Sequence, residues 1–542
     1  MSKKETKKGV SRREFLKGAA VGTGVVGLAG LGAKEAKAAP LPQNWDKEAD
    51  VVVVGYGLAG AAAATIAHDA GAKVLILEKM AKGKEGGNSL VSGSGMWVPS
   101  NKQDAVAYYK AMCAAQLDGP PLHMYDISEE MVEAFVEEMM ENRHILEAMG
   151  VKYGTPRPAE HPLLPGAGTS SIMAVSRADV PAGANVQYYV FSKEVESRKI
   201  EVLFGTPAKK LVTIPEIPGQ QRREVRGVLA GVGGKEIAIK AKRAVVLSCG
   251  GFEFNETMLA NYGRAPMVHS GSPANTGDGI IMAMEVGADL WHMNNDVAPF
   301  HFGFLTNDLG PGFAKTPWTF NISLPGNGVI FVDKYGKRFM NENRPHLHGY
   351  GRDAVFYYDG VKVQYPRIPF WYIFDEGIRK AGPLAGARWS WVGKMSGYTW
   401  SSDNSTEIAK GWILKGDTIE ALATALKVDP AVLATTVNKY NSYATAGADP
   451  DFEREPKSMT PLTKPLYAIK TWPCSVNTQG GPLHNQKCQV LDVWRNPIPR
   501  LYSAGELGSM FAWLYQGYGS MAECLGSGRT AGKNAAAEAP WG

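Results

Sequence analysis

The stretch ADVVVVGYGLAG, residues 49–60, decides the fold of this chain. Its first six residues are mostly apolar and β-branched, which is typical of a buried parallel strand. Residues 61–70 predict a helix, and the strand-forming run Val74 to Leu77 ends at Glu78. The order of strand, G-x-G-x-x-G turn, helix, strand and acid predicts a Rossmann-like βαβ unit that binds a dinucleotide, and hence an α/β fold.

The glycines and the acid of this unit each have a physical role. Gly55 permits the tight turn, Gly57 lets the backbone approach a pyrophosphate, and Gly60 lets the helix pack closely on the strand. The helix N-terminus presents free N–H groups and the positive end of its dipole to the phosphates, and the acid accepts hydrogen bonds from ribose hydroxyls. The residues expected to bind the cofactor here are Gly55, Gly57, Leu58, Ala59, Gly60, Glu78 and Lys79.

The net charge of +5 comes from the N-terminal residues rather than from the whole chain. Removing the nine basic and three acidic residues of 1–38 from the totals of 58 and 53 leaves 49 basic and 50 acidic residues. Because no basic excess remains, we expect no nucleic-acid partner. The five cysteines are scattered, so they indicate neither a disulfide framework nor an iron–sulfur or other metal site.

Residues 1–38 contain the three parts of an export signal in the right order. Residues 11–17, SRREFLK, match the twin-arginine pattern, a glycine-rich apolar stretch spans residues 19–32, and residues 36–38, AKA, offer a cleavage site. The apolar stretch is too short for a permanent transmembrane anchor, and no later segment is long and apolar enough to span a membrane. The sequence therefore predicts a twin-arginine signal peptide and a periplasmic or otherwise extracytoplasmic protein.

A polar, glycine-rich loop follows Glu78 and favours FAD over NAD as the cofactor. This loop, GGNSLVSGSG at residues 86–95, is not usual in NAD folds and resembles the flavin-contacting loop of the fumarate reductase/succinate dehydrogenase flavoprotein superfamily. Some members of that superfamily attach FAD through a histidine near this loop, and since the loop here has none, we expect non-covalent FAD. The resemblance implies that FAD contacts Gly87, Asn88, Ser89, Ser92 and Gly93.

Further motifs of the same superfamily occur in order between Asp50 and the C-terminus. Residues 244–252 resemble its strand ending in a Gly-Gly turn, and NTGDG at 275–279 resembles its TGDG turn, which contains Asp278 here. RLYSAGE at 500–506 resembles its G-L-Y-A-A-G-E strand, whose acid, here Glu506, holds the flavin ribityl chain. The resemblance implies a Rossmann-like FAD-binding domain interrupted by an α+β capping domain that closes over the substrate. We expect the FAD-binding domain at 45–296 and 462–542 and the capping domain at 297–461.

The superfamily divides by the residues that surround the flavin N5. One such position lies four residues after a G-x-R-F-x-N-E motif, which is Gly336–Glu342 here. Fumarate reductases have Arg at that position and 3-ketosteroid dehydrogenases have Tyr, whereas this chain has His346. Because histidine titrates near neutral pH, we expect His346 to be the acid/base, with Arg344 and Tyr350 as neighbouring candidates.

The second position lies in YQGYGSM, residues 515–521. Fumarate reductases have an Arg where Tyr515 stands, which clamps a substrate carboxylate, while 3-ketosteroid dehydrogenases have Y-x-G-x-G, as this chain does. The resemblance implies that the Tyr515 hydroxyl and the Gly519 N–H form an oxyanion hole for a ketone oxygen. It also implies that Ser520 and Met521 begin a helix whose N–H groups face the flavin N1 and O2. Packing of the Tyr515 ring in the core is the purely structural alternative.

These motifs predict an FAD-dependent oxidoreductase that transfers a hydride between flavin N5 and a carbon conjugated to a carbonyl group. The reaction is enone-type C=C reduction or the reverse dehydrogenation, with a ketosteroid-like or other carbonyl substrate. We expect reduction, fed by an external cytochrome- or quinone-linked electron carrier. Two alternatives stay open: a fumarate-type reductase of an unsaturated carboxylic acid, and a non-catalytic flavin electron-transfer subunit. The missing Arg at Tyr515 counts against the first, and the polar neighbours of N5 count against the second.

Overall fold

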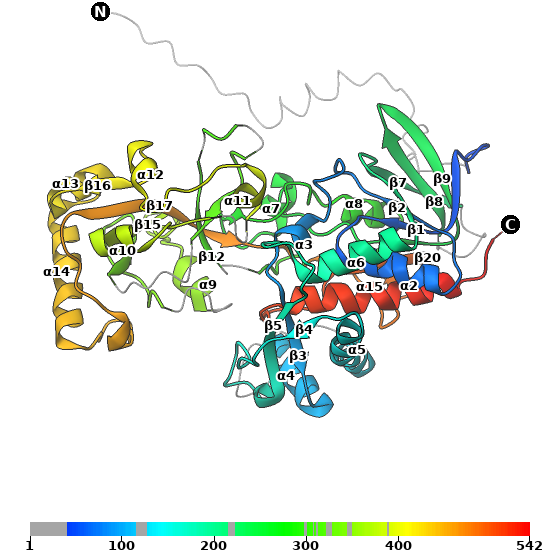
Figure 1. The fold of residues 1–542 in the computed structure, drawn as a ribbon, viewed down its shortest axis with the longest axis horizontal. Coiled ribbons are helices and arrows are strands. Elements are labelled where there is room, and N and C mark those ends of the chain that lie inside the picture. Colours follow the sequence, from blue (N-terminus) through cyan, green and yellow to red (C-terminus); the bar gives the residue numbers. More distant parts are fainter. Residues whose placement is uncertain are drawn as a thin grey trace, which may run out of the picture. The chain divides into compact units, whose positions relative to one another are not determined.

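The computed structural model describes residues 41–114, 127–214, 223–297, 301–306, 308–310, 313–320, 328–343, 350–386 and 390–541 (Figure 1). The expected signal peptide at 1–38 lies outside these residues, and so do Arg344 and His346. Tyr350 begins a helix, but only its backbone is described.

The largest sheet is built around the predicted βαβ unit. Its strands are β1 (Lys47–Val54), β2 (Val74–Leu77), β6 (Glu201–Leu203), β7 (Ala208–Ile214), β8 (Glu224–Val232), β9 (Lys235–Leu247), β19 (Gln489–Leu491) and β20 (Pro497–Ser503). The strand order is β19-β20-β9-β1-β2-β6, and β7 and β8 form an antiparallel extension from β9. The strands from β20 to β6 are parallel, and β1 lies between β9 and β2. A central position with both faces buried explains the continuous β-branched run of β1.

Three helices cover one face of this sheet: α2 (Leu58–Asp69), α6 (Val186–Ser197) and α15 (Gly519–Ala537) (Figure 1). α2 contacts both of the others. A Cβ on Gly528 would lie 2.5 Å from the Ala59 carbonyl oxygen, and one on Gly532 would lie 2.3 Å from that of Ala63. The close approach of α15 to α2 therefore requires glycine at both positions of α15.

The other face of the sheet is covered by α8 (Asp278–Glu285) and the β7–β8 hairpin. Successive residues of β1 point to opposite sides, as in any strand. Val51 and Val53 belong to the core beneath α2, whereas Val52 and Val54 belong to the core that contains α8. The α/β fold with a parallel sheet covered on both faces is thus confirmed.

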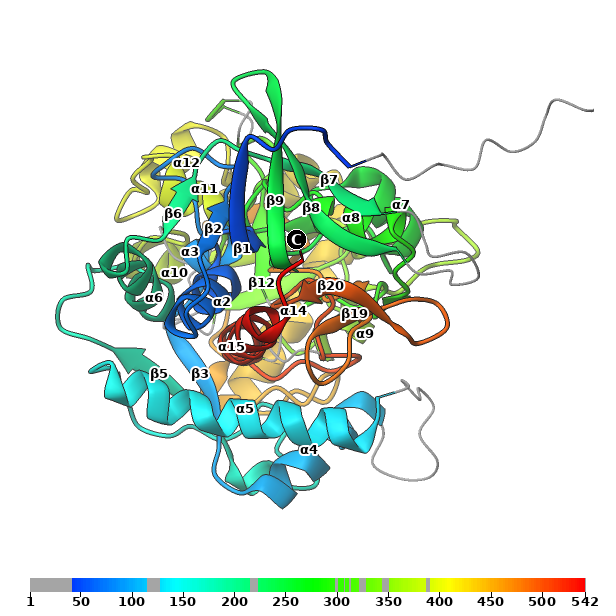
Figure 2. The same ribbon diagram turned by 90° about the vertical axis from the view of Figure 1, so that its right-hand side faces the viewer.

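A small antiparallel sheet and two helices follow the glycine-rich loop, which itself contains the short helix α3 (Gly87–Val91). The strands are β3 (Gly95–Pro99), β4 (Lys152–Tyr153) and β5 (Ser170–Ser176), in the order β3-β5-β4. The helices are α4 (Lys102–Ala114) and α5 (Glu129–Ala148), and α5 packs against α15 (Figure 2).

A second large sheet has the strand order β13-β12-β17-β15-β14, and β10 and β16 also pair with β17. These strands are β10 (Val268–His269), β12 (His301–Phe304), β13 (Trp318–Thr319), β14 (Val329–Val332), β15 (Phe370–Asp375), β16 (Leu414–Gly416) and β17 (Leu466–Ser475). The helices around it are α9 (Tyr350–Val355), α10 (Glu376–Ala381), α11 (Trp391–Met395), α12 (Ser405–Ala409), α13 (Ile419–Leu426) and α14 (Pro430–Ala446). The short elements α7 (Glu256–Tyr262), β11 (Leu290–Trp291) and β18 (Gly481–Pro482) connect the two regions along the chain.

The expected domain boundaries at residues 296 and 462 stay predictions, but the sheet to which each strand belongs is known. β17 begins at Leu466 and pairs with β15 and β12 in the second sheet, so the chain returns to the first sheet only at β19. The pattern of β17 alone could not show this, because an apolar strand fits either sheet and its partners lie far away in the sequence. Within the described ranges, no helix combines the length and the apolar character needed to cross a membrane.

Candidate functional site

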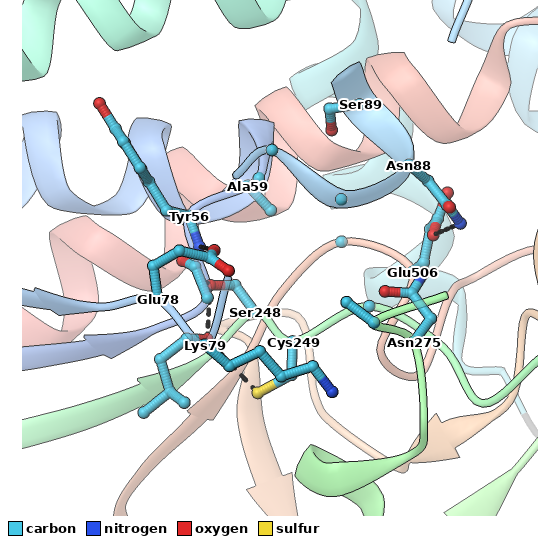
Figure 3. Close-up of a pocket in the computed structure, with 18 of the residues that line it drawn as sticks. Tyr56, Ala59, Glu78, Lys79, Asn88, Ser89, Ser248, Cys249, Asn275 and Glu506 are labelled. Carbon is cyan, nitrogen blue, oxygen red and sulfur yellow. Dashed lines mark hydrogen bonds between the residues drawn. The ribbon is translucent and has the colours of Figure 1, made fainter. Parts of the chain in front are cut away.

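A pocket lies at the carboxyl ends of β1, β2 and β9, where the sequence predicts the dinucleotide (Figure 3). Figure 3 shows Glu78 and Lys79 on one side of it and Asn88 and Glu506 on the other. The expected cofactor residues that line this pocket are Gly55, Gly57, Leu58, Ala59, Glu78, Lys79, Gly87, Asn88, Ser89, Asp278 and Glu506.

The turn after β1 leaves no room for a side chain at two of its glycines. Gly55 has a φ of +103°, and a Cβ there would lie 2.4 Å from the Ser248 carbonyl oxygen. A Cβ on Gly60 would lie 2.0 Å from the carbonyl oxygen of Gly55. Gly60 does not line the pocket. Its missing side chain lets the first turn of α2 pack closely on the glycine turn after β1, so that the N-terminus of α2 lies at the pocket.

We expect Gly60→Ala to lower both the FAD content and the melting temperature of the purified protein, because the added methyl group overlaps a backbone oxygen. Overpacking of this kind typically costs about 1–3 kcal/mol. Flavin absorbance per chain and thermal unfolding measure the two effects. The matched control is Gly168→Ala, since a Cβ there meets no described atom within 4 Å. Identical behaviour of the two variants would show that the turn tolerates a side chain.

Glu78 lies at the end of β2 and has a buried carboxyl group, 6% exposed. It accepts hydrogen bonds from the N–H groups of Tyr56 at 3.0 Å and Met80 at 2.7 Å. Burial raises its pKa above the ordinary value, while the two N–H groups act in the opposite direction. Two N–H donors leave further lone pairs of the carboxylate for ribose hydroxyls.

An ion pair joins the end of β2 to the start of α8 at the rim of the pocket. Lys79 Nζ lies 2.8 Å from Asp278 and also donates to the Thr276 hydroxyl at 2.8 Å. The Thr276 hydroxyl in turn donates to Asp278 at 2.7 Å. Both charged groups are partly exposed, so the pair orients the rim and adds little stability.

Two residues that were not expected at the cofactor lie beside Asn88 and Glu506: Glu253, which belongs to no recognised motif, and Asn275, the first residue of the NTGDG motif. The Asn88 amide donates to Glu253 at 2.7 Å and to Glu506 at 2.9 Å, and the Asn275 amide donates to Glu253 at 2.7 Å. Burial raises the pKa of both carboxyl groups, and the neighbouring Glu253 raises that of Glu506 further. The position of Glu253 directly after the Gly-Gly-Phe turn was the available sequence signal.

The pocket fits FAD by the order of its groups. An acid for ribose hydroxyls, a helix N-terminus with a glycine turn for the diphosphate, and polar side chains for the ribityl chain follow one another around it. At the middle position, Gly57 lines the pocket and faces the glycine-rich loop, since a Cβ there would lie 3.6 Å from Gly86 O and Ser89 Oγ, an ordinary contact distance. Ser89 also accepts the Leu58 N–H at 3.1 Å, which joins that loop to α2.

Ser92 and Gly93, at the far end of the glycine-rich loop, do not line the described pocket. The Gly93 carbonyl oxygen accepts from the Asn185 amide at 3.0 Å, and the Ser94 hydroxyl oxygen accepts the Val186 N–H at 3.0 Å. This end of the loop is therefore tied to the start of α6, and its contact with FAD stays a prediction.

Tyr515 is buried beside the start of α15, with 7% of its surface exposed. Its ring packs edge-on against Phe511 at a centroid distance of 5.1 Å, and its hydroxyl oxygen accepts the Ser520 N–H at 3.1 Å. Burial raises the pKa of Tyr515 well above its ordinary value, so the hydroxyl keeps its proton. A hydroxyl that accepts an N–H at a helix N-terminus and retains its own hydrogen is a strengthened donor, and its donation to a substrate oxygen stays a prediction.

The expected second oxyanion donor has a different partner in this structure. The Gly519 N–H donates to the Gln516 carbonyl oxygen at 2.7 Å, within the loop itself. Ser520 and Met521 are buried in the first turn of α15 and do not line the dinucleotide pocket. The roles of these three residues toward FAD and substrate stay predictions.

Residues from the first half of the chain hold the Tyr515 loop in place. His161 Nε2 lies 2.9 Å from the Tyr515 carbonyl oxygen, and the Glu160 carboxylate accepts the Gly517 N–H at 2.8 Å. Neither residue belongs to a motif recognised in the sequence, because each acts through the backbone of a distant segment.

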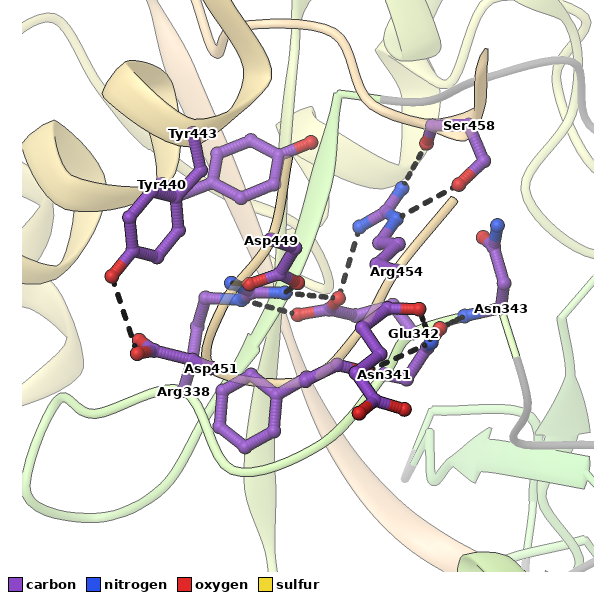
Figure 4. Close-up of polar contacts among 12 residues, drawn as sticks. Arg338, Asn341, Glu342, Asn343, Tyr440, Tyr443, Asp449, Asp451, Arg454 and Ser458 are labelled. Carbon is purple, nitrogen blue, oxygen red and sulfur yellow. Dashed lines mark hydrogen bonds and ion pairs between the residues drawn. The ribbon is translucent and has the colours of Figure 1, made fainter. Parts of the chain in front are cut away.

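Buried ion pairs anchor the motif that precedes His346 (Figure 4). Arg338 donates two hydrogen bonds to Glu342, each 2.8 Å, and pairs with Asp449 at 2.9 Å. Arg454 lies 3.0 Å from Glu342 on its other side. All four side chains are at most 5% exposed, so two cations balance two anions away from water. The network fixes the point from which the chain continues toward His346.

Comparisons with known proteins support FAD as the cofactor. The sequence profile of a family described as "FAD binding domain" matches residues 50–521. Digoxin reductase from Eggerthella lenta is 27% identical over 602 aligned positions that cover 98% of both chains. A probable fumarate reductase from Shewanella frigidimarina is 28% identical over 505 positions, covering 90% of this chain and 75% of the relative.

The fold also matches solved structures. The crystal structure of 3-ketosteroid Δ1-dehydrogenase from Sterolibacterium denitrificans, in complex with 1,4-androstadiene-3,17-dione, superposes with a TM-score of 0.74 at 24% identity. The match covers 91% of this chain and all of that one. At this identity the likeness concerns the fold.

Proposed function

The chain belongs to the FAD binding domain family and is an FAD-dependent oxidoreductase acting on CH–CH or C=C bonds, and we propose that its substrate is a compound whose C=C bond is conjugated to a carbonyl group. When bound, FAD supplies hydride transfer at its N5. The residues of the chain then have two tasks: to stabilise the oxygen that gains charge, and to move a proton at the neighbouring carbon.

Tyr515 is the observation that supports a carbonyl substrate. Its buried hydroxyl is protonated and receives the Ser520 N–H, so it can donate to an oxygen that becomes enolate-like. His346 is proposed to exchange the proton, since imidazole acts as acid and base near neutral pH. The second sheet with its surrounding helices is proposed to be the capping domain, and FAD is proposed to be non-covalent because the glycine-rich loop lacks histidine.

The fumarate-type alternative is favoured by a relative named as a probable fumarate reductase. Tyrosine is a weak anchor for a full negative charge compared with the bidentate guanidinium of arginine. The residue at position 515 therefore favours a neutral carbonyl. An electron-transfer subunit without chemistry would have no use for a protonated hydroxyl held at a helix N-terminus.

A comparison of electron acceptors tests this proposal. The flavin-loaded protein is reduced chemically under anoxia and mixed with a cyclic enone, a 3-ketosteroid, an acrylate or fumarate, and flavin absorbance follows reoxidation. We expect the neutral carbonyl compounds to reoxidise the flavin faster than the carboxylates. Faster reoxidation by fumarate or acrylate would assign the protein to the fumarate-type alternative.

We also propose export by the twin-arginine pathway to an extracytoplasmic compartment, where an external cytochrome- or quinone-linked carrier supplies electrons. The support is the leader sequence at residues 1–38. Replacing Arg12 and Arg13 together with lysine is expected to leave a folded, flavin-loaded protein in the cytoplasm, measured by cell fractionation. Mutating Lys7 and Lys8 to arginine controls for a general effect of basic residues. Normal export of the Arg12/Arg13 variant would rule out this route.

A further inference from the structure

A second pocket shares no lining residue with the dinucleotide pocket in the part of the chain that the structure describes. Its walls come from α7, from β10, from the turn at residues 293–296 and from Tyr365. We name it the His269 pocket after the buried histidine of β10. Its apolar side chains include Phe252, Leu259, Tyr262, Met267 and Met293.

His269 is a buried polar side chain without a polar partner. It is 5% exposed, and neither ring nitrogen has a hydrogen-bond partner among the described residues. Burial lowers its pKa to about 3, so the imidazole is neutral and presents one N–H donor and one acceptor. Its backbone is fixed, because β10 pairs with β17 opposite Ser475.

A comparison with His484 shows that a buried histidine in this fold can have hydrogen-bond partners, so burial alone does not explain their absence at His269 among the described residues. His484 is equally buried, but its two ring nitrogens each lie 3.0 Å from a backbone carbonyl oxygen, of Asn485 and Gly508. A buried polar group without partners costs stability, so its retention in a pocket points to a ligand.

The charges around the His269 pocket favour an uncharged ligand. Among the described lining residues, Arg264 is the cation and Asp296 the anion, so the two cancel. The Arg264 guanidinium lies over the Trp513 ring at 4.2 Å and donates to the Asn294 carbonyl oxygen. A charged ligand would be attracted by one of these two residues and repelled by the other. An uncharged ligand oxygen, by contrast, can form a hydrogen bond with the neutral imidazole of His269.

A layer of hydrogen bonds separates this pocket from the dinucleotide pocket. Thr478 lines the His269 pocket, and its hydroxyl donates to Glu253 at 3.1 Å. Glu253 accepts in turn from Asn88 and Asn275, which line the dinucleotide pocket. A molecule in the His269 pocket thus lies on the other side of Glu253 from the cofactor site.

We propose that the His269 pocket is a second binding site for an uncharged, ring-bearing molecule whose carbonyl or hydroxyl oxygen hydrogen-bonds to His269. Two sources share this chemistry: a quinone-type electron carrier and a cyclic ketone of the substrate class. Binding at this pocket requires no turnover, so the inference goes beyond the proposed function and can fail or succeed without it.

Equilibrium binding to the full-length, flavin-loaded protein tests the proposal. The probes are 2,3-dimethyl-1,4-naphthoquinone and androst-4-ene-3,17-dione, and isothermal titration gives the affinity for wild type, His269→Phe and His269→Gln. We expect one probe to bind wild type with its affinity reduced at least tenfold by His269→Phe and partly restored by His269→Gln, which returns a donor and an acceptor. The probe that shows this pattern identifies the source as carrier or ketone.

Stability separates a ligand site from a structural histidine. We expect His269→Phe to keep its flavin and to melt at or above the wild-type temperature, since it removes polar atoms that have no partner. His484→Phe is expected to melt lower, since it loses contacts to two carbonyl oxygens. Binding of neither probe, binding unaffected by His269→Phe, or a fall in melting temperature like that of His484→Phe would each overturn the proposal.

Discussion

Tyr515→Phe is expected to lower turnover about 10²–10³-fold with little change in KM, which is the typical effect of removing one oxyanion-hole donor. Turnover falls while KM stays nearly constant because the hydrogen bond strengthens only as charge develops on the substrate oxygen. Steady-state kinetics with the best acceptor of the enone series measures both constants. Unchanged turnover would mean that the Tyr515 ring serves packing against Phe511 alone, and the carbonyl proposal would lose its main support.

Tyr109→Phe is the matched control for this variant. The Tyr109 hydroxyl is also buried, and it donates to the Met510 carbonyl oxygen of the neighbouring segment. Both substitutions therefore remove one buried hydroxyl, at a typical cost of about 1 kcal/mol of stability. Only Tyr515→Phe is expected to reduce turnover by two orders of magnitude, whereas equal losses in both variants would indicate a stability effect.

His346→Ala is expected to slow the proton-coupled step about 10²–10⁴-fold while FAD stays bound, as is typical for loss of a general acid or base. The pH dependence should change with it, because the limb that reports titration of the imidazole disappears. Turnover is measured from pH 5 to pH 9 alongside flavin content. Retained activity with an unchanged pH profile would transfer the role to Arg344 or Tyr350.

Asp449→Asn provides the comparison for His346→Ala. It weakens the Arg338 pair that anchors the motif before His346, but it removes no group proposed to carry a proton. We expect a lower melting temperature and a reduced rate with the shape of the pH profile preserved. A preserved profile in Asp449→Asn and a lost limb in His346→Ala together distinguish positioning from proton transfer.

The dinucleotide unit could be predicted because its determinants are contiguous. β1, the glycine turn, α2 and β2 lie within residues 47–77, and the residue types at each position follow from local geometry. Pairings across the sequence could not be predicted in the same way. Lys79 and Asp278 were each expected at the cofactor, but their ion pair joins positions 199 residues apart.

Glu253 shows why part of the site escaped prediction. Its partners Asn88 and Thr478 lie 165 and 225 residues away, so no spacing in the sequence connects them. The same holds for His161, which holds the Tyr515 backbone across 354 residues. Gly519 illustrates a different limit, since the motif specifies the residue type but not that its N–H donates to Gln516 in this conformation.

The contact of α15 with α2 places the end of the described chain beside the start of the flavin pocket. The dinucleotide pocket is lined by residues from Val54 to Cys524, and α2 is covered by α15. Glu506 and α15 are synthesised after nearly all of the described chain. The flavin pocket of a nascent polypeptide is therefore incomplete until the end of translation. We therefore expect FAD to bind only after α15 has been synthesised. A chain truncated before α15 is expected to lack FAD, and, if the proposed export route carries only folded protein, to stay in the cytoplasm.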